Sequence, residues 1–471
     1  MFLRALILIG LLVSSIAAQS GRVVGADSSP SAVATPERSV KEMFDEANGY
    51  ARAKFNEYQA KKVFYSDALL EKTKQEQRAL AAKYAAIAGT RPNLAGEDLY
   101  YLGMLHWIAV NLDGTIEILS KFIVQENVPV ERVQTSRSII VVSLAQQKRF
   151  DEAEKMLAAY LAKEPQKQTE RARMEGELAK AYQAKKDFAK MAPHAEAGYA
   201  ASKALLKDAA SRARGLDEIL DAGMLVFEAY RDLDDRAKAE SALDEMRRTA
   251  AETTSPSFYY YAVDQKIKYL IETGRKPLAT ELYKTTIANI DKEFLAQNQR
   301  DDVLARLQRR EKQYALLGTP APEFIAVDQA WFPGKARKLS DLKGKVVLLD
   351  FWATWCGPCF DAFPDLTEWH ELYGNDLEIL GLTRYYGKAN QMSAEPGVEL
   401  DALKLFREKH KLPYDIVVSS DQAPQLAYDA MALPTAVLID RKGIIRYVET
   451  GTSSTRIEQM RQMMLKLLAE K

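Results

Sequence analysis

The segment KVVLLDFW, residues 345–352, limits the possible folds of this chain more than any other. It is an apolar run rich in β-branched and aromatic residues, which is typical of a strand buried on both faces of a sheet. The two cysteines of the chain, Cys356 and Cys359, follow shortly after it. Apolar side chains then recur at helical spacing from Phe360 to Leu372. This order predicts a strand, a turn with a CxxC motif, and a helix with Cys356 at its N-terminus.

Three kinds of chemistry are open to the cysteine pair. A disulfide that closes so short a loop removes little chain entropy, so it would be a poor structural crosslink. A zinc site would need two more ligands. The histidines are His106, His194, His370 and His410, and no two of them have a paired-ligand spacing. The residues therefore favour redox chemistry.

The two thiols are expected to differ in role because they differ in position. Unpaired backbone N–H groups and the positive end of a helix dipole stabilise a thiolate at a helix N-terminus. Cys356 is therefore expected to be the exposed nucleophile. Cys359 lies one turn further in and is expected to be the resolving thiol that closes the internal disulfide.

Asp350 is an acidic residue inside the apolar strand that precedes the motif. An acid at a strand end can be a solvated or capping residue. Burial in an apolar strand would instead raise its pKa toward neutrality, which suits a group that transfers protons. The second interpretation is preferred.

These residues resemble the active site of the thioredoxin superfamily, in which WCGPC is the redox motif. The resemblance implies that Asp350 exchanges protons with the resolving thiol and that Pro364 kinks the active-site helix. It also identifies ALPTAVLID, residues 432–440, as the cis-proline segment, with Pro434 packed against the disulfide. The remaining residues expected to support the site are Trp355, Gly357, Pro358 and Leu433.

The segments around the motif are similar to the exported TlpA/ResA-type oxidoreductases and the redoxin group. The similarity includes a strand hairpin at residues 438–451, a closing helix at 456–468 and an insert at about 385–405. Many exported members carry a glutamate where this chain has Ala362, and the lysine near the buried acid of thioredoxins is missing from residues 377–384. The Gly-Pro dipeptide implies a reductant. Peroxiredoxins are a weaker alternative, because Leu349 and Ala353 replace the proline and threonine that a peroxide site needs.

The first 20 residues have the pattern of a secretory signal peptide. One early basic residue, Arg4, precedes an apolar core that is short for a membrane span, and small residues follow it. An uncleaved membrane anchor is the alternative. Residues 21–39 are expected to form a flexible leader. Export predicts a periplasmic protein whose electrons come from a membrane-embedded donor.

Residues 40–316 show almost no strand pattern and contain a repeated helix–turn–helix unit. Polar turns recur about every 40 residues, in the range of helical-hairpin solenoids. The unit at residues 135–165 resembles a tetratricopeptide (TPR) repeat through Ala153 and Pro165, although Val141 replaces a small residue. An irregular helical bundle is the alternative. The turns occupy residues 111–115, 147–153, 184–190, 233–239 and 273–279.

The predicted fold class is thus multidomain: an all-α TPR-like domain followed by an α/β thioredoxin-like domain at residues 317–471. Within the helical region, the tyrosines of residues 257–265 are expected to pack between helices rather than line a binding surface. Residues 307–313, LQRREKQ, are expected to form a solvated helix face rather than a docking patch.

Charge and composition restrict the classes of partner that this chain is expected to bind. The chain has 65 basic and 65 acidic residues, and this balance argues against nucleic acid or an anionic membrane as the main partner. No cofactor or metal is expected. Two functions remain: an exported thiol–disulfide oxidoreductase acting on protein thiols and disulfides, with the helical array docking substrate or partner, and an interaction scaffold with a redox-inactive thioredoxin-like module.

Overall fold

The computed structural model describes residues 38–470, except 208–210, 324–328 and 390–391. The expected signal peptide and nearly all of the expected leader lie outside these residues. The described residues form two compact units, divided between Met246 and Arg247. Within the described residues, no helix combines the length and apolar character needed to cross a membrane.

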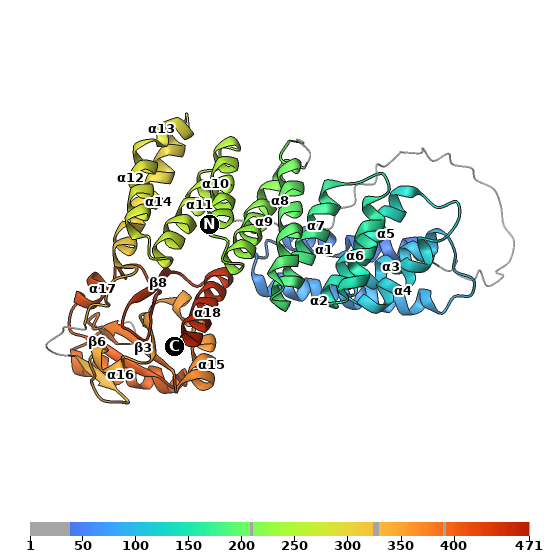
Figure 1. Ribbon diagram of the computed structural model, residues 1–471. Coiled ribbons are helices and arrows are strands. Elements are labelled where there is room, and N and C mark those ends of the chain that lie inside the picture. Colours follow the sequence, from blue (N-terminus) through green and yellow to red (C-terminus); the bar gives the residue numbers. More distant parts are fainter. Residues whose placement is uncertain (1–37, 208–210, 324–328, 390–391, 471) are drawn as a thin grey trace, which may run out of the picture. The chain divides into compact units, whose positions relative to one another are not determined.

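The first unit is built from helices (Figure 1). They form successive hairpins, and α7, α8 and α9 stand side by side. The helices are α1 (Val40–Ala60), α2 (Asp67–Gly89), α3 (Glu97–Ile108), α4 (Leu112–Phe122), α5 (Val130–Gln146), α6 (Phe150–Leu161), α7 (Gln168–Lys185), α8 (Phe188–Leu205), α9 (Arg212–Asp232) and α10 (Arg236–Glu252), the last of which ends in the second unit.

Each of the five predicted turns overlaps the junction between two paired helices, and its later residues belong to the second helix. A residue in the left-handed conformation lies at each junction, which is Val110, directly before the first predicted turn, and Gly274 in the last turn. At the first junction, the Val110 N–H donates to the Trp107 carbonyl and the Asn111 N–H donates to the His106 carbonyl. This pair of bonds satisfies the last carbonyls of a helix and stops it. The left-handed residues of the other turns are Lys148, Lys186 and Asp234.

The second unit combines helices with a mixed sheet, so the helical part followed by a thioredoxin-like α/β part is confirmed. Its elements are α11 (Pro256–Glu272), α12 (Lys276–Ala288), α13 (Ile290–Glu293), α14 (Gln297–Leu316), β1 (Ala330–Phe332), η1 (Leu339–Leu342), β2 (Val346–Phe351), η2 (Gly357–Asp361), α15 (Phe363–Tyr373), β3 (Leu377–Arg384), β4 (Lys388–Ala389), β5 (Met392–Ser393), α16 (Pro396–Lys409), β6 (Asp415–Ser419), α17 (Ala423–Ala427), β7 (Thr435–Ile439), β8 (Ile445–Thr450) and α18 (Ser454–Ala469).

The main sheet has the strand order β1-β6-β3-β2-β7-β8. Strand β2 pairs in parallel with β3 and antiparallel with β7, so the predicted buried strand lies inside the sheet. All six residues of β2 are buried. The predicted hairpin is β7–β8, and its turn contains Gly443 at φ +84°.

One hydrophobic core covers the face of β2 that carries Val346 and Leu348. Helix α15 contributes Leu366 and Trp369 to it, α16 contributes Leu403, and α18 contributes Met460, Met464 and Leu467. Both cysteines belong to this core. The redox motif is therefore anchored by packing from three helices.

The outer edge of β8 is covered by the chain that precedes the sheet. Gly318 N–H donates to the Ile445 carbonyl at 2.8 Å, and Ile445 N–H donates to the Thr319 carbonyl at 2.9 Å. An exposed strand edge invites pairing with other chains, and this segment occupies it.

Helix α14 corrects one sequence interpretation. The segment 307–313 was expected to be a solvated helix face, yet Leu307 is fully buried and Arg310 is 7% exposed. Arg310 is buried because its guanidinium pairs with Glu449 of β8, a partner far away in sequence. The expected packing of the tyrosines is confirmed for Tyr259, which is 1% exposed.

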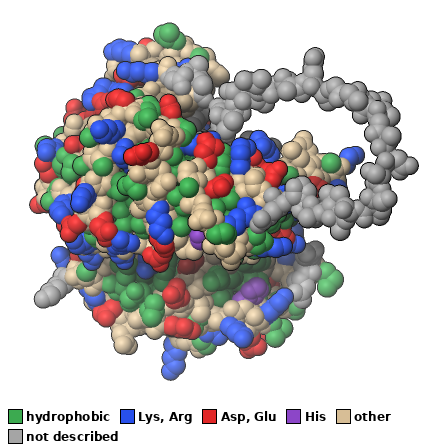
Figure 2. Space-filling view, turned by 90° about the vertical axis from the view of Figure 1, so that its right-hand side faces the viewer, with side chains coloured by type: hydrophobic (Ala, Val, Ile, Leu, Met, Phe, Trp, Pro, Cys, Tyr) green, Lys and Arg blue, Asp and Glu red, His purple; other side chains and the backbone are tan. Residues whose placement is uncertain are grey.

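Charged side chains of both signs are interspersed on the face shown in Figure 2. This mixture agrees with the zero formal net charge of the chain.

Candidate active site

Cys356 and Cys359 form a disulfide with an S–S distance of 2.03 Å and a Cα–Cα distance of 5.4 Å. Cys356 immediately precedes η2, so its predicted place at a helix start is confirmed. The helix itself differs from the prediction. It is a short 3-10 helix that ends at Asp361, and α15 begins separately at Phe363. Pro364 lies in the first turn of α15 and has no N–H to continue the preceding helix.

The predicted exposure of Cys356 is wrong for the disulfide form. Cys356 is 4% exposed and Cys359 is fully buried. The bond to a fully buried sulfur holds the Cys356 side chain inside the core that also contains Trp352 and Phe363. Of the two thiols, Cys356 is still the one closer to solvent.

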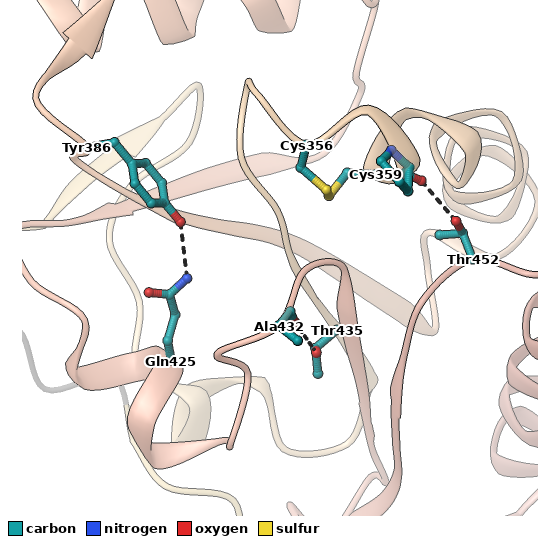
Figure 3. The surroundings of a disulfide bond; sticks show 8 residues. Cys356, Cys359, Tyr386, Gln425, Ala432, Thr435 and Thr452 are labelled. Carbon is teal, nitrogen blue, oxygen red and sulfur yellow. Dashed lines mark hydrogen bonds between the residues drawn. A yellow bond between two sulfur atoms is a disulfide. The ribbon is translucent and has the colours of Figure 1, made fainter. Parts of the chain in front are cut away.

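Trp355 is the exposed residue of the motif. Its side chain is 61% exposed, and its ring meets the Tyr386 ring edge-on at 5.4 Å. Tyr386 in turn accepts a hydrogen bond from Gln425 Nε2 at 3.2 Å. Figure 3 shows Tyr386 and Gln425 beside the disulfide, on the side away from Thr452.

Asp350 is buried beneath the motif, at 3% exposure. Among the described residues its Oδ2 atom has no hydrogen-bond partner. Burial raises the pKa of Asp350 to about 7. The predicted burial and raised pKa are confirmed, and the alternative of a solvated or capping acid is excluded.

Small residues flank Asp350 on both neighbouring strands. It lies opposite Gly381 of β3 and Ala436 of β7. A Cβ atom at Gly381 would lie 2.8 Å from Ile416 Cδ1 and 3.0 Å from Trp352 Nε1, so a larger residue there would require the Ile416 side chain to move. Ile416 of β6 and Trp352, which directly follows β2, thus pack over Gly381 beside the acid.

Two further polar atoms near Asp350 are buried. Trp352 Nε1 and the Tyr414 hydroxyl have no hydrogen-bond partner in the described part of the chain. Burial, and secondarily the charge of Asp350, raises the pKa of Tyr414 well above its usual value. The surroundings of Asp350 therefore disfavour its ionised form.

A small cavity adjoins Asp350 and reaches Ala362, between the end of η2 and the start of α15. Its walls include Asp350, Ala362, Pro434, Ala436, Glu449 and Thr452. Thr452 Oγ1 donates to the Pro358 carbonyl at 3.0 Å, which ties the loop after β8 to the redox motif (Figure 3). Ala362, directly before α15, adds no acid to this cavity, whose acidic lining residues are Asp350 and Glu449.

The cis-proline segment is present. The Leu433–Pro434 peptide bond is cis, as the resemblance predicts. Thr435 Oγ1 donates to the Ala432 carbonyl at 2.7 Å, and Figure 3 shows this turn facing the disulfide. Leu433 is partly buried and packs against the core that contains the cysteines.

Sequence reasoning missed Tyr386, Gln425, Thr452 and Glu449. The first three reach the site from loops and a short helix, where no periodic pattern marks a contact. Glu449 lies on a predicted strand, and an acid facing inward from an apolar strand was the available signal. In the described residues, no group of three or more His, Cys, Asp or Glu is arranged to hold a metal ion.

Comparison with known proteins places this geometry in a family. Residues 317–448 match the AhpC/TSA family. The thiol-disulfide oxidoreductase ResA of Geobacillus kaustophilus is 33% identical over 143 residues, covering 30% of this chain and 74% of that protein. ResA of Bacillus subtilis is 33% identical over 136 residues, covering 29% and 68%. The crystal structure of a thiol-disulfide isomerase from Corynebacterium glutamicum is 23% identical, covers 32% of this chain and 98% of that one, and has a TM-score of 0.28. The chain therefore belongs to the TlpA/ResA-type thiol-disulfide oxidoreductases of the thioredoxin fold.

Proposed function

We propose that this oxidoreductase is exported and reduces disulfides in protein substrates through Cys356 and Cys359. The observation that carries the proposal is the Cys356–Cys359 disulfide above Asp350, a buried acid with a raised pKa. A titratable group with a pKa near neutrality is suited to accept and return a proton at physiological pH.

The reaction begins with the reduced pair. The Cys356 thiolate attacks one sulfur of the substrate disulfide, forming a mixed disulfide and releasing a substrate thiolate, which takes a proton from water. Cys359 then passes its thiol proton to Asp350, and the resulting thiolate attacks Cys356 Sγ. The second substrate sulfur leaves as a thiolate and takes up the proton held by Asp350, so the substrate is now a dithiol and two electrons have moved from the enzyme pair to the substrate. The reverse sequence donates a disulfide.

The supporting residues have proposed roles in this cycle. Trp355 covers the disulfide, and Gly357 and Pro358 keep the loop between the cysteines short and stiff. Pro364 separates η2 from α15, and Leu433 with Pro434 forms the wall that the substrate chain meets. The Thr452 hydrogen bond to the Pro358 carbonyl supports a fixed loop.

The finer assignments extend this proposal to the whole chain. Residues 1–20 act as the signal peptide or as a membrane anchor, residues 21–39 as a leader, residues 40–316 as a TPR-like docking array and residues 317–471 as the redox domain. The five matching turns support the repeat assignment. The enzyme acts in the periplasm and receives electrons from a membrane-embedded donor.

The proposal is tested with cysteine variants and a disulfide-bonded protein substrate. Cys356→Ser is expected to abolish turnover, while Cys359→Ser is expected to accumulate a mixed disulfide through Cys356. The Cys356→Ser/Cys359→Ser variant is the control for thiol-independent effects. Equal activity of Cys356→Ser and the wild type would instead identify a scaffold with an inactive redox module.

Direction and proton transfer need two further measurements. A reduction potential near that of thioredoxin, about −270 mV, supports a reductant, and one near about −120 mV contradicts it. Asp350→Asn is expected to slow resolution of the mixed disulfide by about 10²-fold at pH 7, as for loss of a general base. An unchanged rate would remove Asp350 from the mechanism.

A further inference from the structure

A buried cluster of four charges joins the helices before the sheet to β8. Asp264 and Lys268 lie on α11, Arg310 on α14 and Glu449 on β8. Arg310 binds the Glu449 carboxylate with both terminal nitrogens, at 3.2 and 3.0 Å. Lys268 Nζ lies 2.9 Å from Asp264 and also bonds to Glu449.

The four charges balance one another. Asp264, Arg310 and Glu449 are 3%, 7% and 8% exposed, so solvent screens them little. Burial opposes ionisation of both acids, but Lys268 and Arg310 outweigh it and keep the pKa of Asp264 and of Glu449 below their usual values. Two negative and two positive charges sum to zero, so the intact cluster exerts little net field on its surroundings.

The cluster lies beside the redox site through the register of the sheet. Asp350 of β2 lies opposite Ala436 of β7, and Ala436 lies opposite Glu449 of β8. Residues in such a row point to the same face, so both acids project over Ala436. Both line the same small cavity. Two strand spacings separate them, which is about 10 Å between their Cα atoms.

We propose that Glu449, Arg310 and Lys268 are positioning residues of the redox reaction, which preserve the proton affinity of Asp350 by keeping their cluster neutral across the cavity over Ala436. The helices α11 and α14 thereby form part of the redox machinery as well as of the helical region. This inference rests on the proposed function only for the consequence of the tuning, since it concerns an equilibrium property of the oxidised enzyme.

The other polar groups around Asp350 are the same in all of the cluster variants compared below. Tyr414 approaches from the β3–β6 side, while Tyr447 of β8 and Arg456 of α18 line the cavity or its mouth. Arg456 bonds to the Thr450 carbonyl, and the Tyr447 hydroxyl donates to the Arg456 carbonyl at 3.3 Å. None of these side chains is altered by the variants.

If the cluster acts electrostatically, removing a negative charge and removing a positive charge must shift the pKa of Asp350 in opposite directions. Glu449→Gln leaves a net positive cluster and is expected to lower the pKa of Asp350 by about one unit. Arg310→Gln leaves a net negative cluster and is expected to raise it by about one unit. The readout is the pH titration of the Asp350 carboxyl carbon by ¹³C NMR in the oxidised protein, assigned with Asp350→Asn.

Three controls make the result decisive. Lys268→Gln, at a more exposed site, must shift the pKa in the same direction as Arg310→Gln. The double variant Glu449→Gln/Arg310→Gln restores a neutral cluster and must return the pKa toward the wild-type value. Arg337→Gln removes an equal charge from a more exposed position, where it pairs with Glu378 and Asp415, and must shift the pKa by less than Arg310→Gln does.

Shifts in the same direction for Glu449→Gln and Arg310→Gln would overturn the proposal, because loosened packing predicts that result. No shift in any cluster variant would overturn it as well. Neither failure affects the proposed function, which is decided by turnover of the cysteine variants. Opposite shifts combined with an unchanged resolution rate in Asp350→Asn would support the tuning and contradict the proton-transfer role.

Discussion

Asp350 and Asp264 belong to the same compact unit and are equally buried, at 3% exposure each, yet their acidities change in opposite directions. Burial raises the pKa of Asp350 to about 7. Burial also opposes ionisation of Asp264, but Lys268 and Arg310 overcome it and lower the pKa. Tyr314 adds a hydrogen bond to Asp264 at 2.6 Å.

The difference shows that partners, rather than depth, decide what a buried acid can do. A carboxylate fixed by two cations cannot change its charge near neutral pH without breaking the cluster, so Asp264 is suited to hold α11 and α14 against β8. An acid that is buried without a cation beside it has its pKa raised toward neutrality. Such an acid can both bind and release a proton near pH 7, which suits Asp350 to proton transfer.

The largest effect is expected for Asp264→Asn. It leaves Arg310 and Lys268 facing Glu449 alone, and removing one partner of a buried ion pair costs about 3 to 5 kcal/mol of unfolding free energy. The cost is fully present above the unfolded-state pKa of an aspartate and shrinks as the pH falls, because the lowered pKa stabilises only the ionised form. Urea denaturation at pH 7, followed by tryptophan fluorescence, measures it.

Asp376→Asn is the matched control for that measurement. Asp376 pairs with Arg441 at 3.1 Å, but its side chain is 61% exposed. Exposed pairs contribute about 0 to 1 kcal/mol, so this variant should stay close to the wild type. Equal losses in the two variants would mean that the buried cluster is no stronger than a surface pair.

Much of the redox site could be predicted because its signals are local in sequence. The apolar run before Cys356 specifies a buried strand, and the position of Asp350 within that run specifies its burial. The residues that start and stop hairpins are also local, as Gly443 and the helix turns show. The break between η2 and α15 was foreseeable from Pro364, although the helical spacing beginning at Phe360 concealed it.

The ion cluster could not be predicted in the same way, because its contacts connect distant parts of the chain. Arg310 and Glu449 are 139 residues apart in sequence. Periodicity still held one clue: Arg310 shares a helix face with Val303, Leu307 and Tyr314, all of them buried. A cation in an apolar stripe needs a buried anion, but only the folded sheet identifies that anion as Glu449.

Asp350→Asn is expected to raise the free energy of unfolding at neutral pH, whereas Asp264→Asn lowers it. The folded-state pKa of about 7 lies above the unfolded value of about 3.9, so the contribution of Asp350 to stability is full in acid and is lost as pH rises toward 7. Near pH 8 the ionised acid therefore costs at most about 4 kcal/mol, which asparagine removes.

The difference between wild type and Asp350→Asn, measured by urea denaturation of the oxidised proteins from pH 4 to pH 8, isolates this contribution. It should be near zero at pH 4 and grow with pH in favour of the variant. A difference that does not depend on pH would show that Asp350 keeps an ordinary pKa in the fold.

The smallest changes in stability are expected when one tyrosine hydroxyl is removed beside each of the two acids. Tyr314 donates to Asp264, whereas the Tyr414 hydroxyl is buried without a hydrogen bond to any described residue. Tyr314→Phe removes a bond to a charged group and should cost about 1.5 to 3 kcal/mol. Tyr414→Phe removes only an unsatisfied group, so it should be neutral or stabilise the protein by about 1 kcal/mol. Urea denaturation of the two variants at pH 7 measures both effects. Equal losses of unfolding free energy would show that the Tyr414 hydroxyl has a hydrogen-bond partner, and that the surroundings of Asp350 are less apolar than its raised pKa implies.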